Sequence, residues 1–451
     1  MKLITDPIPG LILKIAVPAS IGMFFQTMYN VVDTYYAGQL SGDALAALSM
    51  SFPPFLMVLS LGIGLGQGAN ALISNALGAG KDKQASLYQV QAISLAVLST
   101  LIFCAVGRYY SEDLFLLMGA EGESLQLVIQ YMNAIWMGGV VMVMVQVCNA
   151  GLLAQGDTKT NRNALIAGFV VNIFLDPLLM YGWGPIPAFG LAGIAWATIA
   201  LQAMVVVYIC WKLIRSRLMA SFRWSEWMPH KALLAEIAYQ GFPSSLNMVM
   251  VSGGIFIITS FVGRFGTEAI AAYGSAMRIE QIVLMPTIGL NISALSLTGQ
   301  NFGAGFLQRV QEVYARTIGY SMALMIPGGM LVYLISPVMM SIFTDQADII
   351  AIGVQYLRID AFALPGYALL FLSLAVLQGL KRPVFGMIIT LIRQVLAPLL
   401  VFTLLIGVWG LGLISLWWGI FGIVWMAALV ALLYTRRALR RSPGHSQTSP
   451  V

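Results

Sequence analysis

The chain has 451 residues, of which 59% are hydrophobic and only 9% are charged. Soluble domains carry about 25% charged residues, so this composition excludes a water-soluble protein. The 24 basic residues outnumber the 18 acidic ones, but their distribution along the chain is typical of a membrane protein and does not indicate nucleic-acid binding.

Apolar runs of about 20 residues, each long enough to cross roughly 30 Å of hydrocarbon, recur along the whole chain. They predict an all-α polytopic membrane protein with twelve transmembrane helices, at residues 8–37, 44–77, 85–107, 124–153, 161–181, 189–212, 233–262, 268–300, 310–343, 349–379, 383–407 and 410–435. Three cysteines, Cys104, Cys148 and Cys210, lie within these spans. They are interpreted as small hydrophobic residues, and a disulfide framework is not expected.

Basic residues are concentrated in every second loop. If the N-terminus is cytoplasmic, the inner loops hold most of the Lys and Arg residues, whereas the outer loops hold only Arg108 and Arg264. This asymmetry follows the positive-inside rule and predicts that both termini lie in the cytoplasm. The first apolar segment is too long for a cleavable signal peptide and lacks a small-residue cleavage site.

An internal repeat divides the chain into two halves. Residues 18–80 recur at residues 243–305 with a constant shift of 225, which pairs Pro18 with Pro243. An even number of helices in each half places both halves the same way up in the membrane, as parallel repeats. The repeat therefore predicts two pseudo-symmetric six-helix lobes: an amino-terminal lobe at 1–211, a cytoplasmic linker at 212–232 lying along the membrane surface, a carboxy-terminal lobe at 233–437, and a cytoplasmic tail at 438–451.

The second span carries a glycine at every second position, Gly62, Gly64, Gly66 and Gly68. Small residues in this pattern predict a close contact with another helix. The same glycines imitate a dinucleotide-binding fingerprint, but no strand precedes them and they lie in a lipid-spanning segment. The sequence has no Walker A motif, and its two histidines near polar ends exclude a histidine-based zinc site. No cofactor, resident metal or ATP is therefore expected.

Four acidic residues lie well inside predicted spans: Asp33, Asp176, Glu280 and Asp360. A charge at such a depth costs at least about 2.5–3.5 kcal/mol. Each of these side chains therefore needs a partner, a bound proton or water.

Asp33 and Asp176 are predicted to lie in the same outer layer of the amino-terminal lobe. Asp33 is near the outer end of the first span, and Asp176 is about 15 residues, or roughly 23 Å, into the fifth. Asn172 lies four residues before Asp176 on the same helix face, and Thr198 is at a comparable height on the next helix. Two carboxyl groups in such a cluster are able to share a proton or to coordinate a small hard cation; simple hydrogen bonding between helices is the structural alternative.

The first span also presents a polar stripe, since Gln26, Tyr29 and Asp33 follow i, i+3, i+7 spacing. Below this stripe Pro18 removes a backbone hydrogen bond in mid-helix. A kink at Pro18 either allows the Asp33 end of the helix to swing when Asp33 changes its protonation state, or serves static packing. The repeat places Ile258 at the position of Asp33 in the second half.

The carboxy-terminal lobe has a different set of charges at mid-membrane depth. Arg278 lies close in sequence to Glu280, Arg358 lies close to Asp360, and Arg393 occupies the position of Asn172 in the repeat. Three arginines against two acids predict mutually neutralising pairs, with a role in coupling or substrate binding as the alternative.

Several motifs together resemble the multidrug and toxic compound extrusion (MATE) transporter family over about residues 8 to 435. The motifs are Val31-Val32-Asp33 with Gly38 after a proline-containing first helix, Gly78-Ala79-Gly80, Gln155-Gly156-Asp157-Thr158-Lys159 and Thr298-Gly299-Gln300-Asn301-Phe302-Gly303-Ala304. Asn172-x-x-x-Asp176 beside Asp33 is similar to the prokaryotic DinF-like branch of this family.

The resemblance implies a secondary active exporter in the prokaryotic inner membrane that moves amphipathic or cationic drugs by cation-driven alternating access; H+ is the expected coupling ion, because a bending first helix offers a direct protonation switch. The residues that it assigns are, for cation coupling, Asp33, Asn172, Asp176 and Thr198; for the bending point, Pro18; and for the amino-lobe substrate cavity, Gln26, Tyr29, Tyr131 and Asn149. If coupling uses Na+ instead, the ion is expected at Asp33, Asn172 and Asp176.

Other function classes are disfavoured by the residues. A lipid or polysaccharide flippase of the same superfamily needs a cleft rich in cationic residues, whereas the amino lobe concentrates acids. The sequence has no Ser/His pair and no HExxH motif, so an enzyme is not expected. A monomer is the default expectation, because the two lobes lie within one chain.

Overall fold

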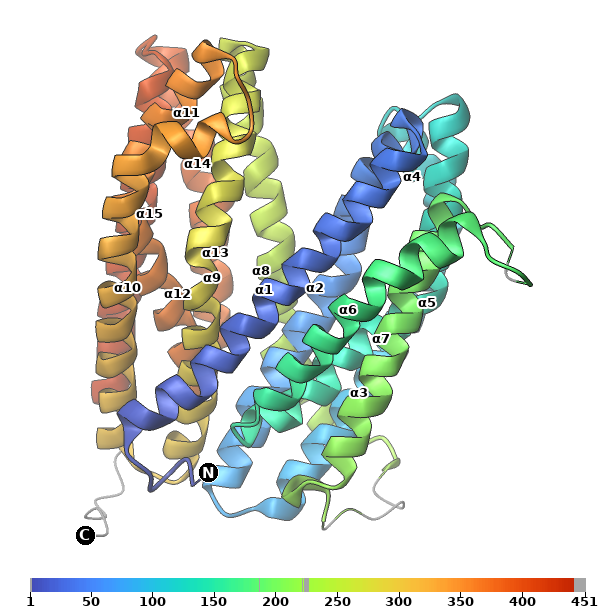
Figure 1. The fold of residues 1–451 in the computed structure, drawn as a ribbon. Coiled ribbons are helices and arrows are strands. Elements are labelled where there is room, and N and C mark those ends of the chain that lie inside the picture. Colours follow the sequence, from blue (N-terminus) through green and yellow to red (C-terminus); the bar gives the residue numbers. More distant parts are fainter. Residues whose placement is uncertain (1, 186, 221, 223–226, 442–451) are drawn as a thin grey trace. The chain divides into compact units, whose positions relative to one another are not determined.

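The computed structural model describes residues 2–185, 187–220, 222 and 227–441 (Figure 1). These residues are almost entirely helical, and no β-strand occurs among them. The α-helices are α1 (Ile8–Leu40), α2 (Gly42–Gly78), α3 (Asp82–Tyr109), α4 (Ser111–Leu117), α5 (Gly122–Ala154), α6 (Lys159–Tyr181), α7 (Leu191–Ile214), α8 (Lys231–Val262), α9 (Thr267–Gly303), α10 (Leu307–Ser341), α11 (Ala347–Asp360), α12 (Leu364–Gly379), α13 (Pro383–Leu391), α14 (Ala397–Phe402) and α15 (Leu413–Arg441). The shorter turns are the 3-10 helices η1 (Arg217–Met219) and η3 (Gly263–Phe265) and the π-helices η4 (Ile392–Leu396) and η5 (Thr403–Val408).

The predicted all-α membrane fold is confirmed. Within the described residues, eleven helices are long and apolar enough to cross a membrane, and α11 with α12 makes a twelfth span if the bent pair counts as one. These two helices meet at an angle of 52°, because Pro365 in the first turn of α12 has no N–H to continue the hydrogen bonding of α11. The protein is thus a multi-pass membrane protein.

The structure differs from the predicted organisation at the start of the tail and at one short helix. The last span continues as helix α15 to Arg441, so residues 438–441 of the predicted tail are helical. Residues 442–451 of that tail, and Arg223 and Trp224 of the predicted linker, lie outside the described residues. The short helix α4 was not predicted, because seven residues are too few to produce a periodic signal.

The chain folds into two compact units whose boundaries differ from the sequence-based lobes. We call residues Ile21–Met248 the amino unit, and Met1–Ser20 together with Val249–Val451 the carboxy unit. The first turns of α1 therefore belong to the carboxy unit, and the first half of α8 belongs to the amino unit. Both division points follow a helix-interior proline, two residues after Pro18 and five residues after Pro243.

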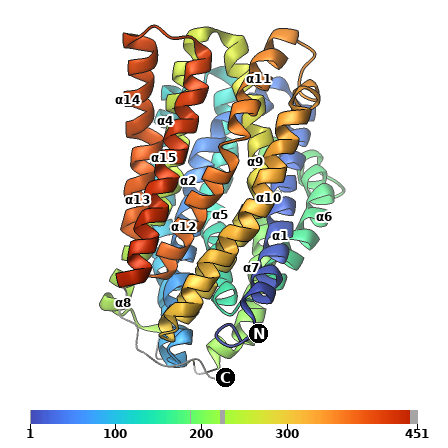
Figure 2. The same ribbon diagram turned by 90° about the vertical axis from the view of Figure 1, so that its left-hand side faces the viewer.

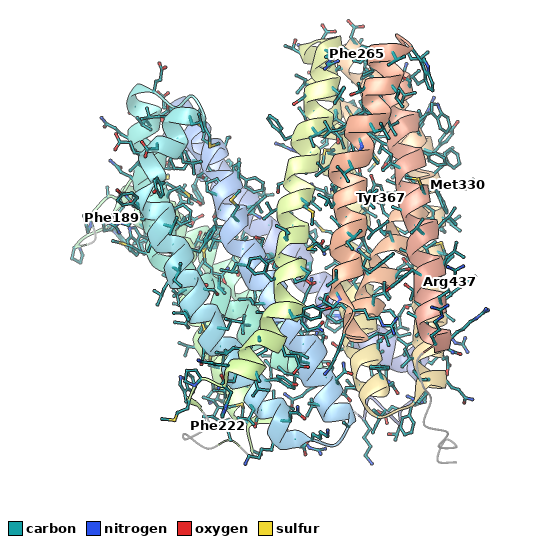
Figure 3. All side chains as sticks on the ribbon, turned by 180° about the vertical axis from the view of Figure 1, so that it is seen from behind. Phe189, Phe222, Phe265, Met330, Tyr367 and Arg437 are labelled. Carbon is teal, nitrogen blue, oxygen red and sulfur yellow. The ribbon has the colours of Figure 1, made fainter. Side chains whose placement is uncertain are left out.

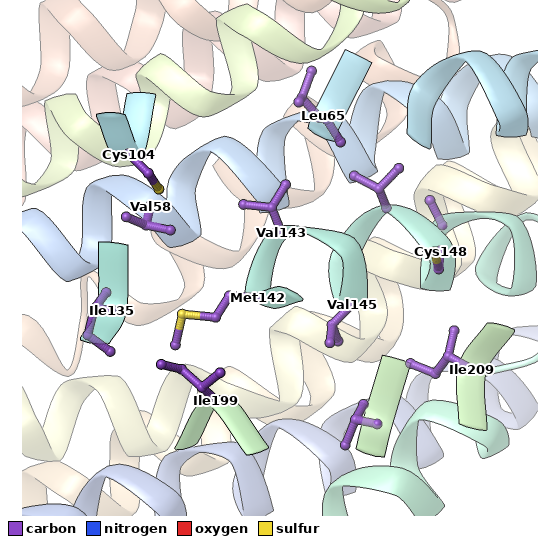
Figure 4. Packing of buried hydrophobic residues seen from close by; sticks show 14 of the residues in the cluster. Val58, Leu65, Cys104, Ile135, Met142, Val143, Val145, Cys148, Ile199 and Ile209 are labelled. Atoms are coloured by element: carbon purple, nitrogen blue, oxygen red, sulfur yellow. The ribbon is translucent and has the colours of Figure 1, made fainter. Parts of the chain in front are cut away.

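The amino unit is built around α5, which contacts α2, α3 and α7, while α6 packs against α7. Its core contains aliphatic, methionine and cysteine side chains such as Met142, Val143 and Ile199 (Figure 4). Aromatic side chains, among them Tyr131 and Trp136, belong to the same core. These residues come from helices that are apolar around most of their circumference, as expected for segments that face either protein or lipid.

In the carboxy unit α9 contacts α10, α11 and α12, and α12 also packs against α15 (Figure 2). Trp417 of α15 is fully buried at the centre of an aromatic group, with its ring 5.8 Å from that of Tyr273 and 5.0 Å from that of Tyr356. Outward-facing side chains are apolar as well: Met330 of α10, labelled in Figure 3, is 66% exposed. Exposed apolar side chains of this size are expected to face lipid.

The predicted close contact at the glycines of α2 is confirmed within the amino unit. A Cβ atom on Gly64 would overlap Ser245 of α8, and one on Gly68 would lie 2.6 Å from the backbone nitrogen of Gly241. Glycine at these two positions thus lets the backbones of α2 and α8 touch.

We expect Gly68→Ala to destabilise the protein by about 1–3 kcal/mol, because the added methyl group meets backbone that has no side chain to move aside. The measurement is the unfolding temperature of the purified protein in detergent. Gly319→Ala in α10 is the matched control, since a Cβ atom there meets nothing within 4 Å. Equal unfolding temperatures for Gly68→Ala and the control would show that α2 and α8 are not tightly packed.

Candidate functional site

The two carboxylic acids predicted from sequence meet in the interior of the amino unit. Asp33 projects from the second half of α1 and is 8% exposed, whereas Asp176 projects from α6 and is fully buried. Their carboxyl groups lie within hydrogen-bonding reach of each other. Two carboxylates this close in an apolar interior repel each other, so the arrangement favours one shared proton or a bound cation.

Asn172 connects the two acids. Its amide nitrogen donates hydrogen bonds to Asp176 Oδ1 at 2.8 Å and to Asp33 Oδ1 at 3.4 Å. The i, i+4 spacing places Asn172 and Asp176 on one face of α6, as the sequence predicted. Asp176 Oδ2 and Asn172 Oδ1 are buried and have no hydrogen-bond partner among the described residues. The site therefore offers two free oxygen acceptors next to the acids.

Thr198 and Tyr131 complete the surroundings of the acids. Thr198 of α7 lies beside Asp33, and its hydroxyl donates to the carbonyl oxygen of Ile194 at 3.1 Å. Tyr131 of α5 is 4% exposed and lies near both carboxyl groups. With the free oxygen of Asn172, the carboxylates and the Thr198 hydroxyl form an all-oxygen donor set of the kind that binds Na+ or a proton.

Two tyrosines fasten the second half of α1 to α6. Tyr29 donates a hydrogen bond to the carbonyl oxygen of Leu165 at 3.0 Å, and Tyr36 donates to that of Ile173 at 3.0 Å. Sequence reasoning missed Tyr36, although it extends the stripe of Gln26, Tyr29 and Asp33 by one further turn. The position of Asp33 in α1 is thus set by hydrogen bonds on either side of it.

The structure does not bring every candidate residue to the acids. Gln26 is half-buried and lies seven residues before Asp33, about 10 Å along the helix. Asn149 is buried on α5 but is 18 residues from Tyr131, roughly 27 Å further along the helix axis. Pro18 lies inside α1 and in the carboxy unit, 15 residues or about 22 Å before Asp33.

A second polar cluster lies in the carboxy unit. Asp360 is 3% exposed and Arg393 is 8% exposed, and Tyr356 donates a hydrogen bond to Glu280 Oε2 at 2.7 Å. The Arg393 guanidinium lies 5.5 Å from the ring centroid of Tyr367, a residue labelled in Figure 3. Arg393 Nε and Asp360 Oδ1 are buried without a hydrogen-bond partner among the described residues.

The ion pairs predicted for this lobe do not form as expected. Arg217 pairs with Asp82 and Arg316 with Glu312, whereas in the described part of the chain neither Arg278 nor Arg358 forms an ion pair with the acid next to it in sequence. Arg278 and Arg358 are exposed, and Arg358 lies over the ring of Tyr333 instead of next to Asp360. The physical reason is helix geometry, since residues two apart, such as Arg278 and Glu280, point in different directions. Arg393 is the arginine that enters the cluster, and it does so from the π-helical turn η4.

Gly168 of α6 allows Tyr29 to reach its partner, because a Cβ atom at this position would overlap the Tyr29 hydroxyl. We expect Gly168→Ala to lower the unfolding temperature in detergent, by the equivalent of about 1–3 kcal/mol for overpacking. The Tyr29→Phe change removes the overlapping oxygen, so Gly168→Ala should cost less in the Tyr29→Phe background. Additive effects of the two changes would contradict this packing.

This helical membrane protein is built from two repeats. The first repeat buries an acid at Asp33, where the second has Ile258. Such a construction is typical of a secondary transporter. Comparison with known families identifies which one. The MatE family profile matches the chain twice, at residues 18–178 and 243–403, and these two ranges reproduce the internal repeat. The chain belongs to the MATE family of multidrug efflux transporters.

Individual relatives agree with this assignment. The chain is 28% identical over 404 residues to a protein of Shewanella oneidensis described as an FAD transporter, with 88% of each chain covered. It is 24% identical over 377 residues to the multidrug export protein MepA of Staphylococcus aureus, covering 83% of this chain and 82% of that protein. A solved MOP superfamily transporter of Pyrococcus furiosus superposes with a TM-score of 0.91 and 26% identity over 97% of both chains.

The family has also been solved in two shapes. A MATE structure in a straight conformation superposes on this chain with a TM-score of 0.90, and one in a bent conformation with a TM-score of 0.91. The fold of this chain is therefore compatible with both.

Proposed function

We propose that the protein is a proton-coupled exporter of amphipathic or cationic organic compounds. The observation that carries this proposal is the direct contact of Asp33, Asn172 and Asp176 inside the amino unit. Membership of the MATE family supports the transport of small molecules across the membrane. The buried acids supply a place where a coupling ion binds, and no cofactor or ATP enters the cycle.

In this proposal the proton acts through hydrogen bonding to α1. When the two acids share one proton, their carboxyl groups form a hydrogen bond with each other, and Asn172 donates a hydrogen bond to each of them. When that proton leaves, two like charges face each other at close range and Asp33 is driven away from Asp176. Because Asp33 is fixed in α1, the second half of that helix moves with it and bends at Pro18, close to the division between the units.

Four further assignments belong to the proposal: the substrate-contacting residues, the orientation in the membrane, the working unit and the branch of the family. Gln26, Tyr29 and Tyr131 are the polar residues that substrates meet in the amino unit, with Asn149 contributing further along α5. Both termini lie on the cytoplasmic side of a prokaryotic inner membrane, the monomer is the working unit, and the chain belongs to the DinF-like branch.

Sodium coupling is the second candidate, since a specific observation favours it. Asp176 Oδ2 and Asn172 Oδ1 are oxygens without hydrogen-bond partners in the described structure, and Na+ is bound by such oxygens. A flippase for an anionic lipid is less well supported, because the amino unit presents acids and not bases at its polar centre.

The experiment is export of a cationic dye from proteoliposomes under a pH gradient alone and under a sodium gradient alone. Export driven by the pH gradient alone supports the proton proposal. Export driven by sodium alone makes the three residues ligands of Na+. If neither gradient moves the dye, FAD is the next substrate to test, because a relative is described as its transporter; failure with FAD too would favour the flippase.

A further inference from the structure

Two of the three cysteines of the chain meet inside the amino unit. Cys210 of α7 donates a hydrogen bond from its thiol to the sulfur of Cys148 of α5, with the two Sγ atoms 3.6 Å apart. Both thiols are free in this structure. The two residues are 62 positions apart in the sequence, so only the packing of α5 on α7 brings them together.

The two thiols differ in their access to small molecules. Cys148 is fully buried in the core that Figure 4 shows, where it shares a hydrophobic cluster with Ile209, the neighbour of Cys210. Cys210 is only partly buried. A small neutral oxidant that enters the protein from the membrane or the cytoplasm therefore reaches Cys210 first.

Cys104 provides an internal comparison. It is a buried cysteine of the same unit, on α3, and its sulfur packs against Gly139 of α5. No other thiol lies beside it in the described structure. The proximity of Cys148 and Cys210 is thus a property of that pair and not of every buried cysteine in this core.

We propose that Cys148 and Cys210 form an oxidation-sensitive dithiol that hydrogen peroxide converts to a disulfide joining α5 to α7. This site is independent of the transport function proposed above. Its chemistry needs two thiols in contact and one two-electron oxidant, and the geometry supplies the contact.

The reaction proceeds in two balanced steps. The Cys210 thiolate attacks one oxygen of the peroxide, so that an S–O bond forms, the O–O bond breaks, and the leaving hydroxide takes a proton to become water. The sulfur of Cys148 then attacks the resulting sulfenic acid, so that the S–S bond forms and the S–O bond breaks. The leaving hydroxide takes the Cys148 proton as water. Two thiols are oxidised and one peroxide is reduced to two waters.

The disulfide ties together two helices of the proposed coupling region. Helix α5 carries Tyr131, and α7 carries Thr198, which is 12 residues or about 18 Å from Cys210. A bond between the helices restricts the unfolded chain and the separation of α5 from α7. We therefore expect oxidised protein to unfold at a higher temperature than reduced protein, and the difference to disappear after treatment with dithiothreitol.

The experiment uses the full-length Cys104→Ser variant, which keeps only the two cysteines in question. The purified protein in detergent is treated with hydrogen peroxide, unfolded in dodecyl sulfate, and labelled with maleimide-polyethylene glycol. We expect the number of labelled thiols per chain to fall from two to zero, and the mass of the unlabelled protein to fall by two hydrogens. Treatment with dithiothreitol should restore both labels. Cys148→Ser and Cys210→Ser, each in the Cys104→Ser background, should form no such intramolecular bond.

Three results would overturn the proposal. Two thiols that stay fully labelled at peroxide concentrations that oxidise free cysteine show that the pair does not react. A mass increase from sulfinic or sulfonic acid shows that Cys210 oxidises without Cys148. A dithiothreitol-sensitive dimer on the gel shows that Cys210 joins a second copy of the chain. The main test uses Cys104→Ser alone, so the proposal can still be tested if Cys148→Ser or Cys210→Ser fails to fold.

Discussion

Asp33→Asn is expected to reduce gradient-driven dye export to the rate of protein-free vesicles while the protein remains folded. Asparagine has nearly the shape of aspartate, and its carbonyl oxygen is able to accept the hydrogen bond that Asn172 now donates to Asp33. It has no ionisable proton, so the charge change that we propose to move α1 is lost. The measurement is dye export from proteoliposomes, with the unfolding temperature of each variant recorded alongside.

The control is Asp43→Asn, which removes an exposed acid at the start of α2. This variant should export at the wild-type rate. Wild-type export by Asp33→Asn would refute a coupling role for Asp33. Loss of export together with a large fall in unfolding temperature would assign Asp33 to packing instead, because then the fold itself depends on the carboxylate.

Asp176 allows the shared-proton account to be separated from two independent sites. If the acids act as one unit, Asp176→Asn should stop export as completely as Asp33→Asn, and the double variant should be no worse than either single one. Independent sites would leave each single variant with part of its export, and only the double variant would lose all of it. The contact of the two carboxyl groups with Asn172 is the reason to expect the first outcome.

The fold and the acid pair were predictable from the sequence because both depend on local patterns. Runs of apolar residues determine where helices cross lipid, since a backbone in hydrocarbon must satisfy its own hydrogen bonds. Counting residues from the membrane face placed Asp33 and Asp176 at one depth, and the spacing of Asn172 placed its amide beside Asp176. The predicted contact among these three residues is present in the structure.

What the sequence could not provide depends on how helices pack. The division of α1 after Ser20 follows from contacts with α9, where Gly289 makes room for Ala16 and Ser20, and a hydropathy pattern contains no such information. The separation of Tyr131 and Asn149, about 27 Å, is predictable from their spacing along one helix. Their assignment to one substrate cavity rests on the family resemblance and not on helix geometry.

The charges of the carboxy unit illustrate the same limit. The sequence predicts that each acid pairs with the arginine two residues before it. In the structure those two arginines are exposed, and the buried arginine is Arg393, which is distant in sequence from both acids. The π-helical turn η4 that carries Arg393 has no simple signature in sequence. The repeat did locate Arg393 at the position of Asn172, so pseudo-symmetry was the better guide to its place.

Arg393→Met is expected to be the most destabilising change in the carboxy unit, because it leaves Glu280 and Asp360 in the interior without a cation. Removing one partner from a buried charged group costs about 3–5 kcal/mol, and Arg393 is 8% exposed in a cluster that holds two acids. Methionine preserves most of the side-chain volume, so the loss reports charge and not a cavity. The measurement is the unfolding temperature in detergent, with Arg358→Met as the matched control at an exposed arginine.

The companion variant decides whether Arg393 acts as a counter-charge. If it does, Glu280→Gln should recover part of the stability that Arg393→Met loses, because it removes one of the two acids that the guanidinium balances. Arg393→Lys should lose less than Arg393→Met, since it keeps the positive charge but not the planar contact with Tyr367. An Arg393→Met protein as stable as wild type would show that the two acids are neutralised without the guanidinium, by protons alone. Because Asp360 Oδ1 has no hydrogen-bond partner among the described residues, that result would make Asp360 the group to substitute next.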